Sequence, residues 1–280
     1  MGTRSDKRTA SEKRFEEYLE AVGHRWRRID ARGRAASKTP DYLVRLPDAP
    51  GPLCEVKEFT STHLDRRLTA GGPGHVITTS GETISSPVRD AIHVAAGQLK
   101  PFEGRGRALI VVLANPHTIA VHLRVRDLIV AMYGDLTLRG TVDTATGEPI
   151  DGGEVVLGRN GELRTDHRSV SGVAVVRRRT YEDDFWERWA LEHPEDEPTS
   201  IDEADEAAVR MVGVAAANPI PTGEYYYLEV LETLSVKKGL AVPVPRSLVC
   251  GPRDCLWAVN ATDEYEVVHH GADWQNIPTL

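Results

Sequence analysis

Three residues suited to metal or phosphate chemistry lie on either side of a turn rich in proline and glycine. Asp41 precedes a short apolar segment over 42–46, and Glu55 and Lys57 belong to a second apolar segment over 53–59. Because successive side chains of a strand point to opposite faces, Glu55 and Lys57 share one face. Two carboxylates and an ammonium group at one place are costly unless something binds between them. A divalent cation on the carboxylates, with the lysine beside a water, would account for the grouping.

These residues are predicted to lie on a β-hairpin. The turn over 47–52, PDAPGP, contains residues that do not continue a strand ladder. If odd positions of the two strands pair with each other, Asp41 lies on the face of Glu55 and Lys57; if odd pairs with even, it lies on the opposite face. Asp48 also precedes the second strand, but it lies inside the turn, so hairpin geometry favours Asp41.

A helix is predicted over 11–22, before the hairpin in the chain. Ser11 is its candidate cap, an apolar stripe follows, and the helix is expected to stop at Gly23. Glu12 and Glu16 lie beside the apolar stripe. Either carboxylate could therefore face inward near the hairpin.

The segment after the hairpin predicts a crossover to a second buried strand. A loop rich in Gly, Ser and Thr over 68–86 is expected either to close over a substrate or to be disordered. A helix over 87–102 has proline in its first turn, and a continuous apolar segment over 108–113 is typical of a parallel strand. The order strand, helix, strand favours an α/β sheet.

Composition excludes several classes of protein. The chain has 280 residues, of which 40% are hydrophobic, and no apolar run approaches the roughly 20 residues of a membrane span. Three cysteines argue against a disulfide framework, and the first residues lack the apolar core of a secretory signal, so a cytoplasmic protein is expected. No phosphate-binding glycine loop or nucleophile elbow is present. The pair Cys250 and Cys255, and the pair His269 and His270, are weak zinc candidates.

The net charge of −8 is unevenly distributed along the chain. Residues 182–206 hold twelve Asp/Glu and one Arg, and their aromatic residues predict an amphipathic helix in part of this segment. Residues 1–45 hold twelve Lys/Arg against seven Asp/Glu, which fits either a phosphate-facing surface or a solubilising N-terminus. The acidic segment could also lie over the basic surface and inhibit it.

The hairpin residues resemble a nuclease motif. Pro40-Asp41, thirteen further residues and then Glu55-Val56-Lys57 resemble the PD-(D/E)XK motif of the restriction-endonuclease-like superfamily. The helix that carries Glu12 resembles the opening helix of its Holliday-junction-resolvase-like members. The segment 98–102, QLKPF, resembles the glutamine-containing helix that follows the motif in several branches. The resemblance covers residues 11–114.

This resemblance implies a magnesium or manganese site. Asp41 and Glu55 would hold the cation, the Val56 carbonyl would complete its shell, and Glu12 would contribute through water. The catalytic residues that it implies are Asp41, Glu55, Lys57 and Gln98. Lys57 would orient or deprotonate the attacking water or stabilise charge on the phosphate, and Gln98 would position the site or the substrate backbone. No small-molecule cofactor is implied.

The implied fold is a restriction-endonuclease-like α/β core, a mixed central sheet flanked by helices, with an elaborated C-terminal region. The expected organisation is a flexible N-terminus over 1–10, the core over 11–180, an acidic helical segment over 181–212 and an extension over 213–280 that packs on the core.

The expected function is metal-dependent hydrolysis of phosphodiester bonds in DNA. The alternative is a catalytically inactive module of the same fold that binds nucleic acid or a protein partner, in which Glu55 and Lys57 form an ordinary salt-bridge pattern on a sheet face. DNA is the expected partner, a homodimer is left open, and no membrane association is expected.

Overall fold

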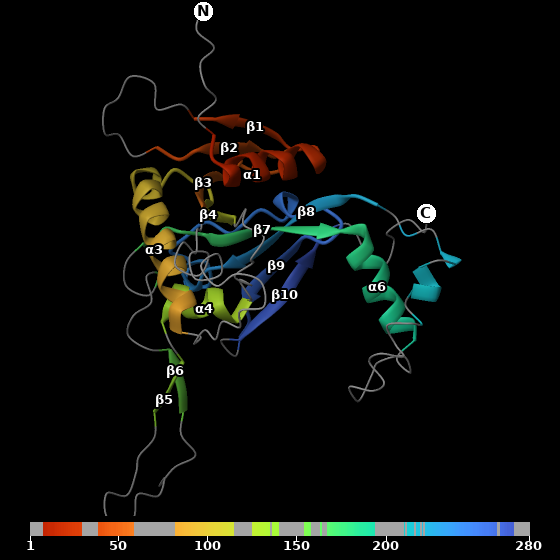
Figure 1. Ribbon diagram of the computed structural model, residues 1–280. Helices are drawn as coiled ribbons and strands as arrows, with labels where there is room; N and C mark the ends of the chain where they lie inside the picture. Colours follow the sequence, from red (N-terminus) through yellow and green to blue (C-terminus); the bar gives the residue numbers. More distant parts are fainter. Residues whose placement is uncertain are drawn as a thin grey trace, which may run out of the picture.

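The computed structural model describes residues 8–29, 39–58, 82–114, 125–134, 136–139, 154–157, 163, 167–193, 210, 212–215, 217–218, 220, 222–261 and 264–271. They form an α/β protein with one mixed sheet of eight strands and several helices (Figure 1). The α/β class and the mixed sheet expected from the sequence are therefore confirmed. Within these ranges, no helix has both the length and the hydrophobicity needed to cross a membrane.

The strands of the large sheet lie in the order β1-β2-β3-β4-β7-β8-β9-β10. At the centre, β3, β4 and β7 run parallel, and β1, β2 and β3 form an antiparallel meander on one side. On the other side, β8 is antiparallel to β7, β9 is parallel to β8, and β10 is antiparallel to β9. The bounds are β1 (Arg25–Arg28), β2 (Tyr42–Arg45), β3 (Leu53–Glu58), β4 (Leu109–Ala114), β7 (Gly172–Thr180), β8 (Glu224–Glu232), β9 (Cys255–Val259) and β10 (Tyr265–His270).

Helices cover the sheet, and a separate two-stranded ladder extends from it. The helices are α1 (Ala10–Ala21), α3 (Glu82–Leu99), α4 (Val125–Tyr133), α6 (Tyr181–Glu192) and the short α8 (Leu234–Lys237), with 3-10 turns η1 (Lys100–Phe102) and η3 (Arg246–Leu248). The small ladder pairs β5 (Leu136–Arg139) with β6 (Glu154–Leu157).

Two hydrophobic cores lie on the two faces of the large sheet. One core joins Phe15 and Leu19 of α1 to the even-numbered side chains Cys54 and Val56 of β3. The other joins α3 and α4 to the opposite face, which includes Leu53. Figure 1 shows α1 and α4 on opposite sides of the sheet. The even and odd residues of β3 therefore face different helices, and Glu55 and Lys57 belong to the α3 face.

The predicted crossover is confirmed, with different helix bounds. β3 and β4 are parallel neighbours, and α3 lies between them in the chain and packs on them. The helix starts at Glu82 rather than Pro87, so the prediction that Pro87 lies in the first turn is wrong. Residues 82–86 show no helical repeat of apolar residues in the sequence. They are helical because extending the packed part of α3 by further turns costs less than starting a helix. Positions 68–81 of the predicted loop lie outside the described residues.

The first helix is confirmed with a different cap. Thr9 caps α1 in a capping box with Glu12, whereas the predicted cap Ser11 is buried and donates to the Ala114 carbonyl of β4 at 3.0 Å. The helix ends before Gly23, which adopts a positive φ of 76° that suits glycine at this position.

The C-terminal region contributes to the main sheet. Residues 213–280, expected as an extension packed on the core, supply β8, β9 and β10. The amphipathic helix expected in the acidic segment is α6, in which Phe185 contacts Trp186 and Trp189. Beyond His193 the acidic run up to 206 lies outside the described residues.

Candidate functional site

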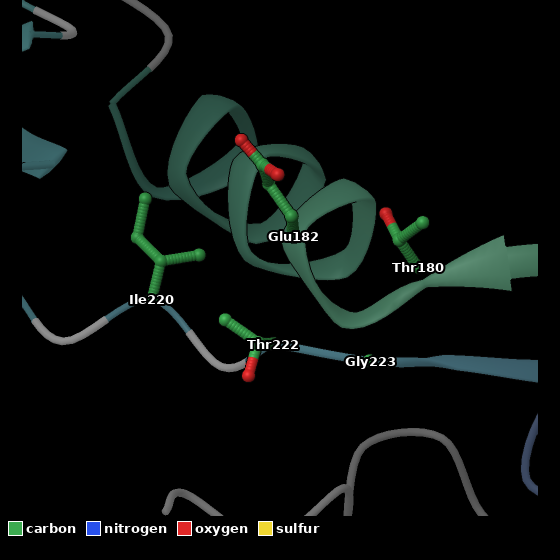
Figure 2. A pocket seen from close by; sticks show the side chains of 5 residues that line it. All are labelled: Thr180, Glu182, Ile220, Thr222 and Gly223. Carbon is green, nitrogen blue, oxygen red and sulfur yellow. The ribbon is translucent and has the colours of Figure 1, made fainter.

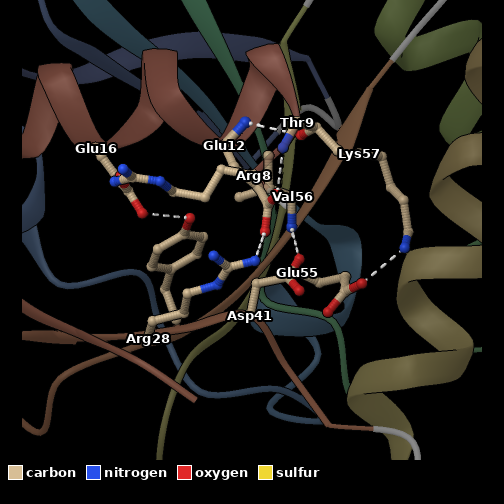
Figure 3. Close-up of polar contacts among 10 residues, drawn as sticks. Arg8, Thr9, Glu12, Glu16, Arg28, Asp41, Glu55, Val56 and Lys57 are labelled. Atoms are coloured by element: carbon tan, nitrogen blue, oxygen red, sulfur yellow. Dashed lines mark hydrogen bonds and ion pairs between the residues drawn. The ribbon is translucent and has the colours of Figure 1, made fainter. Parts of the chain in front are cut away.

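Strand pairing places Asp41 beside Glu55. The ladder pairs Tyr42 with Cys54 and Leu43 with Leu53, so odd positions pair with odd positions. One residue further along this register, Asp41 lies across from Glu55. Its Oδ2 accepts a hydrogen bond from the Val56 backbone N–H at 2.9 Å (Figure 3). The register on which the predicted site depended is the observed one.

Glu55 is a buried carboxylate with only half of its hydrogen-bonding capacity used. Its side chain is 1% exposed, and Oε1 accepts from the Lys57 ammonium at 2.7 Å. Its other oxygen, Oε2, is buried and has no hydrogen-bond partner among the described residues. Buried polar atoms are nearly always paired with protein groups, ordered water or an ion, so this oxygen can accept a further partner.

Lys57 connects the β-hairpin to the crossover helix. Its Nζ donates to Glu55 and also to the Gln98 Oε1 at 2.5 Å. Gln98 lies near the C-terminal end of α3, which packs on the odd-numbered face of β3. The predicted residues Glu55, Lys57 and Gln98 therefore form one chain of contacts.

Burial and a neighbouring carboxylate raise the pKa values of both Asp41 and Glu55. The pKa of Glu55 is raised to about 7 by burial and by the Asp41 charge, although Lys57 acts in the opposite direction. Burial also raises the pKa of Asp41, while its hydrogen bond from Val56 lowers it. A cation between the two groups would remove both causes of the increase, since it replaces lost hydration and offsets the repulsion.

The donor set fits a hard divalent cation. Mg²⁺ and Mn²⁺ prefer carboxylate and carbonyl oxygens, and Glu55 Oε2 is such an oxygen without a partner. Over the described ranges, no cluster of three or more His, Cys, Asp or Glu side chains is arranged to hold a metal. The candidate therefore rests on the pair Asp41 and Glu55, and the role of the Val56 carbonyl stays a prediction.

Glu12 is near this pair but is already engaged. It belongs to α1, on the opposite face of the sheet, and its oxygens accept from the Thr9 N–H at 2.6 Å and from Arg28 at 2.8 Å (Figure 3). Its charge still contributes to raising the pKa of Asp41. Its predicted contribution to the metal through water stays a prediction.

Glu16 also faces inward, as the sequence allowed. It accepts from the Tyr42 hydroxyl at 2.8 Å and pairs with Arg8 at 2.6 Å. Nothing in the sequence marks Arg8, Arg28 or Tyr42 as partners of these carboxylates. Alternation along β1 places Arg28 on the face of Trp26, but only the packing of α1 on that face brings it to Glu12.

The other sequence candidates do not join this site. Asp48 is exposed in the turn, away from the ladder position opposite Glu55. Cys250 lies 3.5 Å from His24, whereas Cys255 lies beside Glu229 and His269 contacts the Val249 carbonyl. The described residues thus contain no zinc ligand set around these cysteines.

A shallow pocket of about 240 Å³ lies elsewhere, between the end of β7, the start of α6 and the segment before β8 (Figure 2). It is lined by Thr180, Glu182, Ile220, Thr222 and Gly223. None of these residues belongs to the carboxylate site.

Comparisons of this chain with protein-family models, with curated proteins and with solved structures find no match.

Proposed function

We propose that this protein is a metal-dependent nuclease with a restriction-endonuclease-like core that hydrolyses phosphodiester bonds of DNA. The observation that carries the proposal is the state of Glu55, which is buried beside Asp41, contacts Lys57 and has one oxygen without a partner. An ordinary salt bridge on an exposed sheet face explains neither the burial nor the unpartnered oxygen.

Asp41 and Glu55 are the residues that would hold Mg²⁺ or Mn²⁺. The bound ion would supply neutralisation of charge on the phosphate and a lower pKa for a bound water. Asp41 is kept in place by the Val56 N–H, and Glu55 is kept in place by Lys57. Both carboxylates are therefore oriented before any ligand binds, which is what efficient catalysis requires.

Lys57 and Gln98 would act on the substrate and on the attacking water. The Lys57 side chain is 22% exposed, so its ammonium group can contact a phosphate oxygen or an attacking water while it stays against Glu55. A fixed cation at this place stabilises negative charge that develops in the transition state. Gln98 accepts from Lys57 and so restricts where the ammonium group lies.

The experiment is cleavage of linear and supercoiled DNA by the purified protein, with and without Mg²⁺ or Mn²⁺. Cleavage is expected only with the cation, and it should be lost in Asp41→Ala, Glu55→Ala and Lys57→Ala. Gln98→Ala should retain the activity at a rate lower by about tenfold, the effect of one hydrogen bond to a charged group.

Two matched variants serve as controls. Asp48→Ala removes the exposed aspartate of the turn, and Glu58→Ala removes the exposed glutamate at the end of β3; both should cleave at the wild-type rate. Unchanged cleavage in the three site variants would exclude the assignment. Binding of DNA without cleavage, and without heat on addition of Mg²⁺, would favour the inactive nuclease-fold module.

A further inference from the structure

Three arginines form a basic strip on the outer strands of the sheet. The basic strip consists of Arg25 and Arg27 of β1 and Arg45 of β2, and all three side chains are exposed. Arg25 lies directly opposite Arg45 in the antiparallel ladder. Like charges directly opposite each other destabilise a strand pair, so the strip has a cost that a bound anion would remove.

The basic strip lies on the α3 face of the sheet. Trp26 lies between the two β1 arginines and packs edge-on against Tyr42, with ring centroids 5.6 Å apart, in the core beneath α1. Because strand side chains alternate, Arg25 and Arg27 point to the opposite face. The same alternation puts Arg45 there, since it is paired with Arg25.

The strip begins one row from the proposed site. Arg27 lies opposite Leu43, which lies opposite Leu53 of β3, and these residues form one row across three strands. The next row on the same face contains Asp41 and Glu55. Rows on one face are two residues apart, a distance of about 6.8 Å along the strands.

The arginines of the strip lack counter-charges. Within the ranges that the structure describes, none of the three forms an ion pair with a carboxylate. Other arginines of the sheet are paired, as Arg28 is with Glu12 and Arg177 is with Glu229. The strip is thus set apart both by its exposure and by its unopposed charge.

We propose that the basic strip binds the phosphate backbone of double-stranded DNA and leads it to the carboxylate site. This inference rests on the proposed function, because it takes the row of Asp41 and Glu55 as the place of cleavage. The strip presents guanidinium groups with aliphatic neighbours such as Leu43, and the aromatic side chains of β1 and β2 point to the other face. Backbone contacts without stacking surfaces are typical of duplex binding rather than of single-strand binding.

The test is the salt dependence of DNA binding, measured by fluorescence anisotropy in EDTA, where no cleavage occurs. The probes are a DNA duplex, one of its strands as single-stranded DNA, and a single-stranded RNA of the same sequence. Replacing Arg25, Arg27 and Arg45 together by Gln should reduce the slope of log affinity against log salt by about 2.7 for the duplex, about 0.9 for each phosphate contact. A reduction confined to a single-stranded probe, near 2.1, would overturn the duplex assignment.

A matched control removes three exposed cations outside β1 and β2, in the triple variant of Arg168, Lys238 and Arg246 to Gln. Its slope should equal that of the wild type. The triple Arg→Lys variant of the strip should restore the slope, because a lysine also neutralises a phosphate. Equal slopes for the strip and control variants would overturn the inference.

The wild-type protein alone gives a second test, in case the strip variant does not fold. Three phosphate contacts require a duplex slope of at least about 2.7, so a smaller wild-type slope contradicts the inference without any variant. The DNA-binding inference and the nuclease proposal can be rejected independently of each other. If the Gln variant of the strip loses slope but the wild type never cleaves DNA, the basic strip is supported and the nuclease is rejected. If the wild type cleaves DNA but the Gln variant keeps its slope, the nuclease is supported and the basic strip is rejected.

Discussion

At the scale of single residues, the proposed chemistry depends on the environment of Glu55. Its carboxylate is removed from water and faces the charge of Asp41, while Oε1 accepts a hydrogen bond from Lys57. The pKa of about 7 reflects the free-energy cost of keeping Glu55 charged in the folded protein. A structural salt bridge would be expected to lower this pKa. The increase instead fits the proposal that a cation binds beside Asp41 and Glu55.

The pH dependence of stability should reveal this cost. The folded-state pKa of Glu55 is raised from 4.5 to about 7, so the folded protein binds the proton more tightly than the unfolded chain. The contribution of Glu55 to the wild-type free energy of unfolding therefore falls as pH rises from about 4.5 and levels off above about 7. Glu55→Gln removes this fall, and between these limits the variant should gain up to about 3 kcal/mol relative to the wild type. Urea denaturation in EDTA at several pH values measures it.

Glu58→Gln is the control, since Glu58 is exposed on the same strand and faces the other way. Its stability should follow the wild-type pH curve. Parallel curves for the wild type and Glu55→Gln would contradict the assigned environment of Glu55. Addition of Mg²⁺ at pH 8 should stabilise the wild type and leave Glu55→Gln unaffected.

At the scale of elements, the β2–β3 hairpin decides whether the carboxylates meet. Its register depends on a close approach between the turn and β2, where the Val44 N–H donates to the Pro52 carbonyl at 3.1 Å. Gly51 lies within this approach, and a Cβ added there would lie 1.8 Å from the Val44 carbonyl oxygen. Glycine is thus required at this position for space.

Gly51→Ala should therefore lower the free energy of unfolding by at least about 2 kcal/mol, because the new methyl group cannot be accommodated without moving the backbone. If the variant folds, the proposed nuclease activity should fall as well, since a displaced β2 moves Asp41. Chemical denaturation and DNA cleavage measure the two effects. Gly213→Ala, which meets no atom within 4 Å, should be neutral. Equal stability of the two variants would show that the turn tolerates the side chain.

At the scale of the whole molecule, a buried aspartate joins the N-terminal helix to the last third of the chain. Asp254 is 1% exposed and accepts from the Tyr18 hydroxyl at 2.6 Å and from the Leu228 N–H at 2.7 Å. It also accepts from the backbone N–H groups of Cys250 and Gly251. One side chain thus connects α1, β8 and the loop before β9. The hairpin and the C-terminal strands also share one sheet, so we expect them to unfold together.

Asp254→Ala leaves the backbone N–H groups of Leu228, Cys250 and Gly251 without this acceptor, and each such group costs about 1–3 kcal/mol, whereas the Tyr18 hydroxyl can still donate to the Leu248 carbonyl. The free energy of unfolding should fall by at least about 3 kcal/mol, as measured by urea denaturation, and Asp254→Asn should lose less because it keeps one oxygen. The matched control, Asp48→Ala in the exposed turn, should change stability by less than about 0.5 kcal/mol. A loss below about 1 kcal/mol in Asp254→Ala would mean that the two parts are stabilised independently.

The sequence by itself determined the local elements and their order. Turn residues over 47–52 defined the hairpin, the apolar stripe of 11–22 defined α1, and the apolar run over 108–113 defined a buried strand, because each pattern reflects the geometry of one segment. Alternation alone placed Glu55 and Lys57 on one face. These elements named Asp41, Glu55 and Lys57 as candidates, and the resemblance to the nuclease motif added the Val56 carbonyl and Gln98.

Only the tertiary structure decided how distant segments meet. It chose the odd-to-odd register that brings Asp41 to Glu55, brought Gln98 to Lys57, and gave Glu12 a partner in Arg28. It also placed the C-terminal strands in the same sheet as the hairpin. Hydrophobic patterns show which face of a segment is buried but not which segment covers it, because that choice depends on packing and hydrogen bonds between residues far apart in the chain.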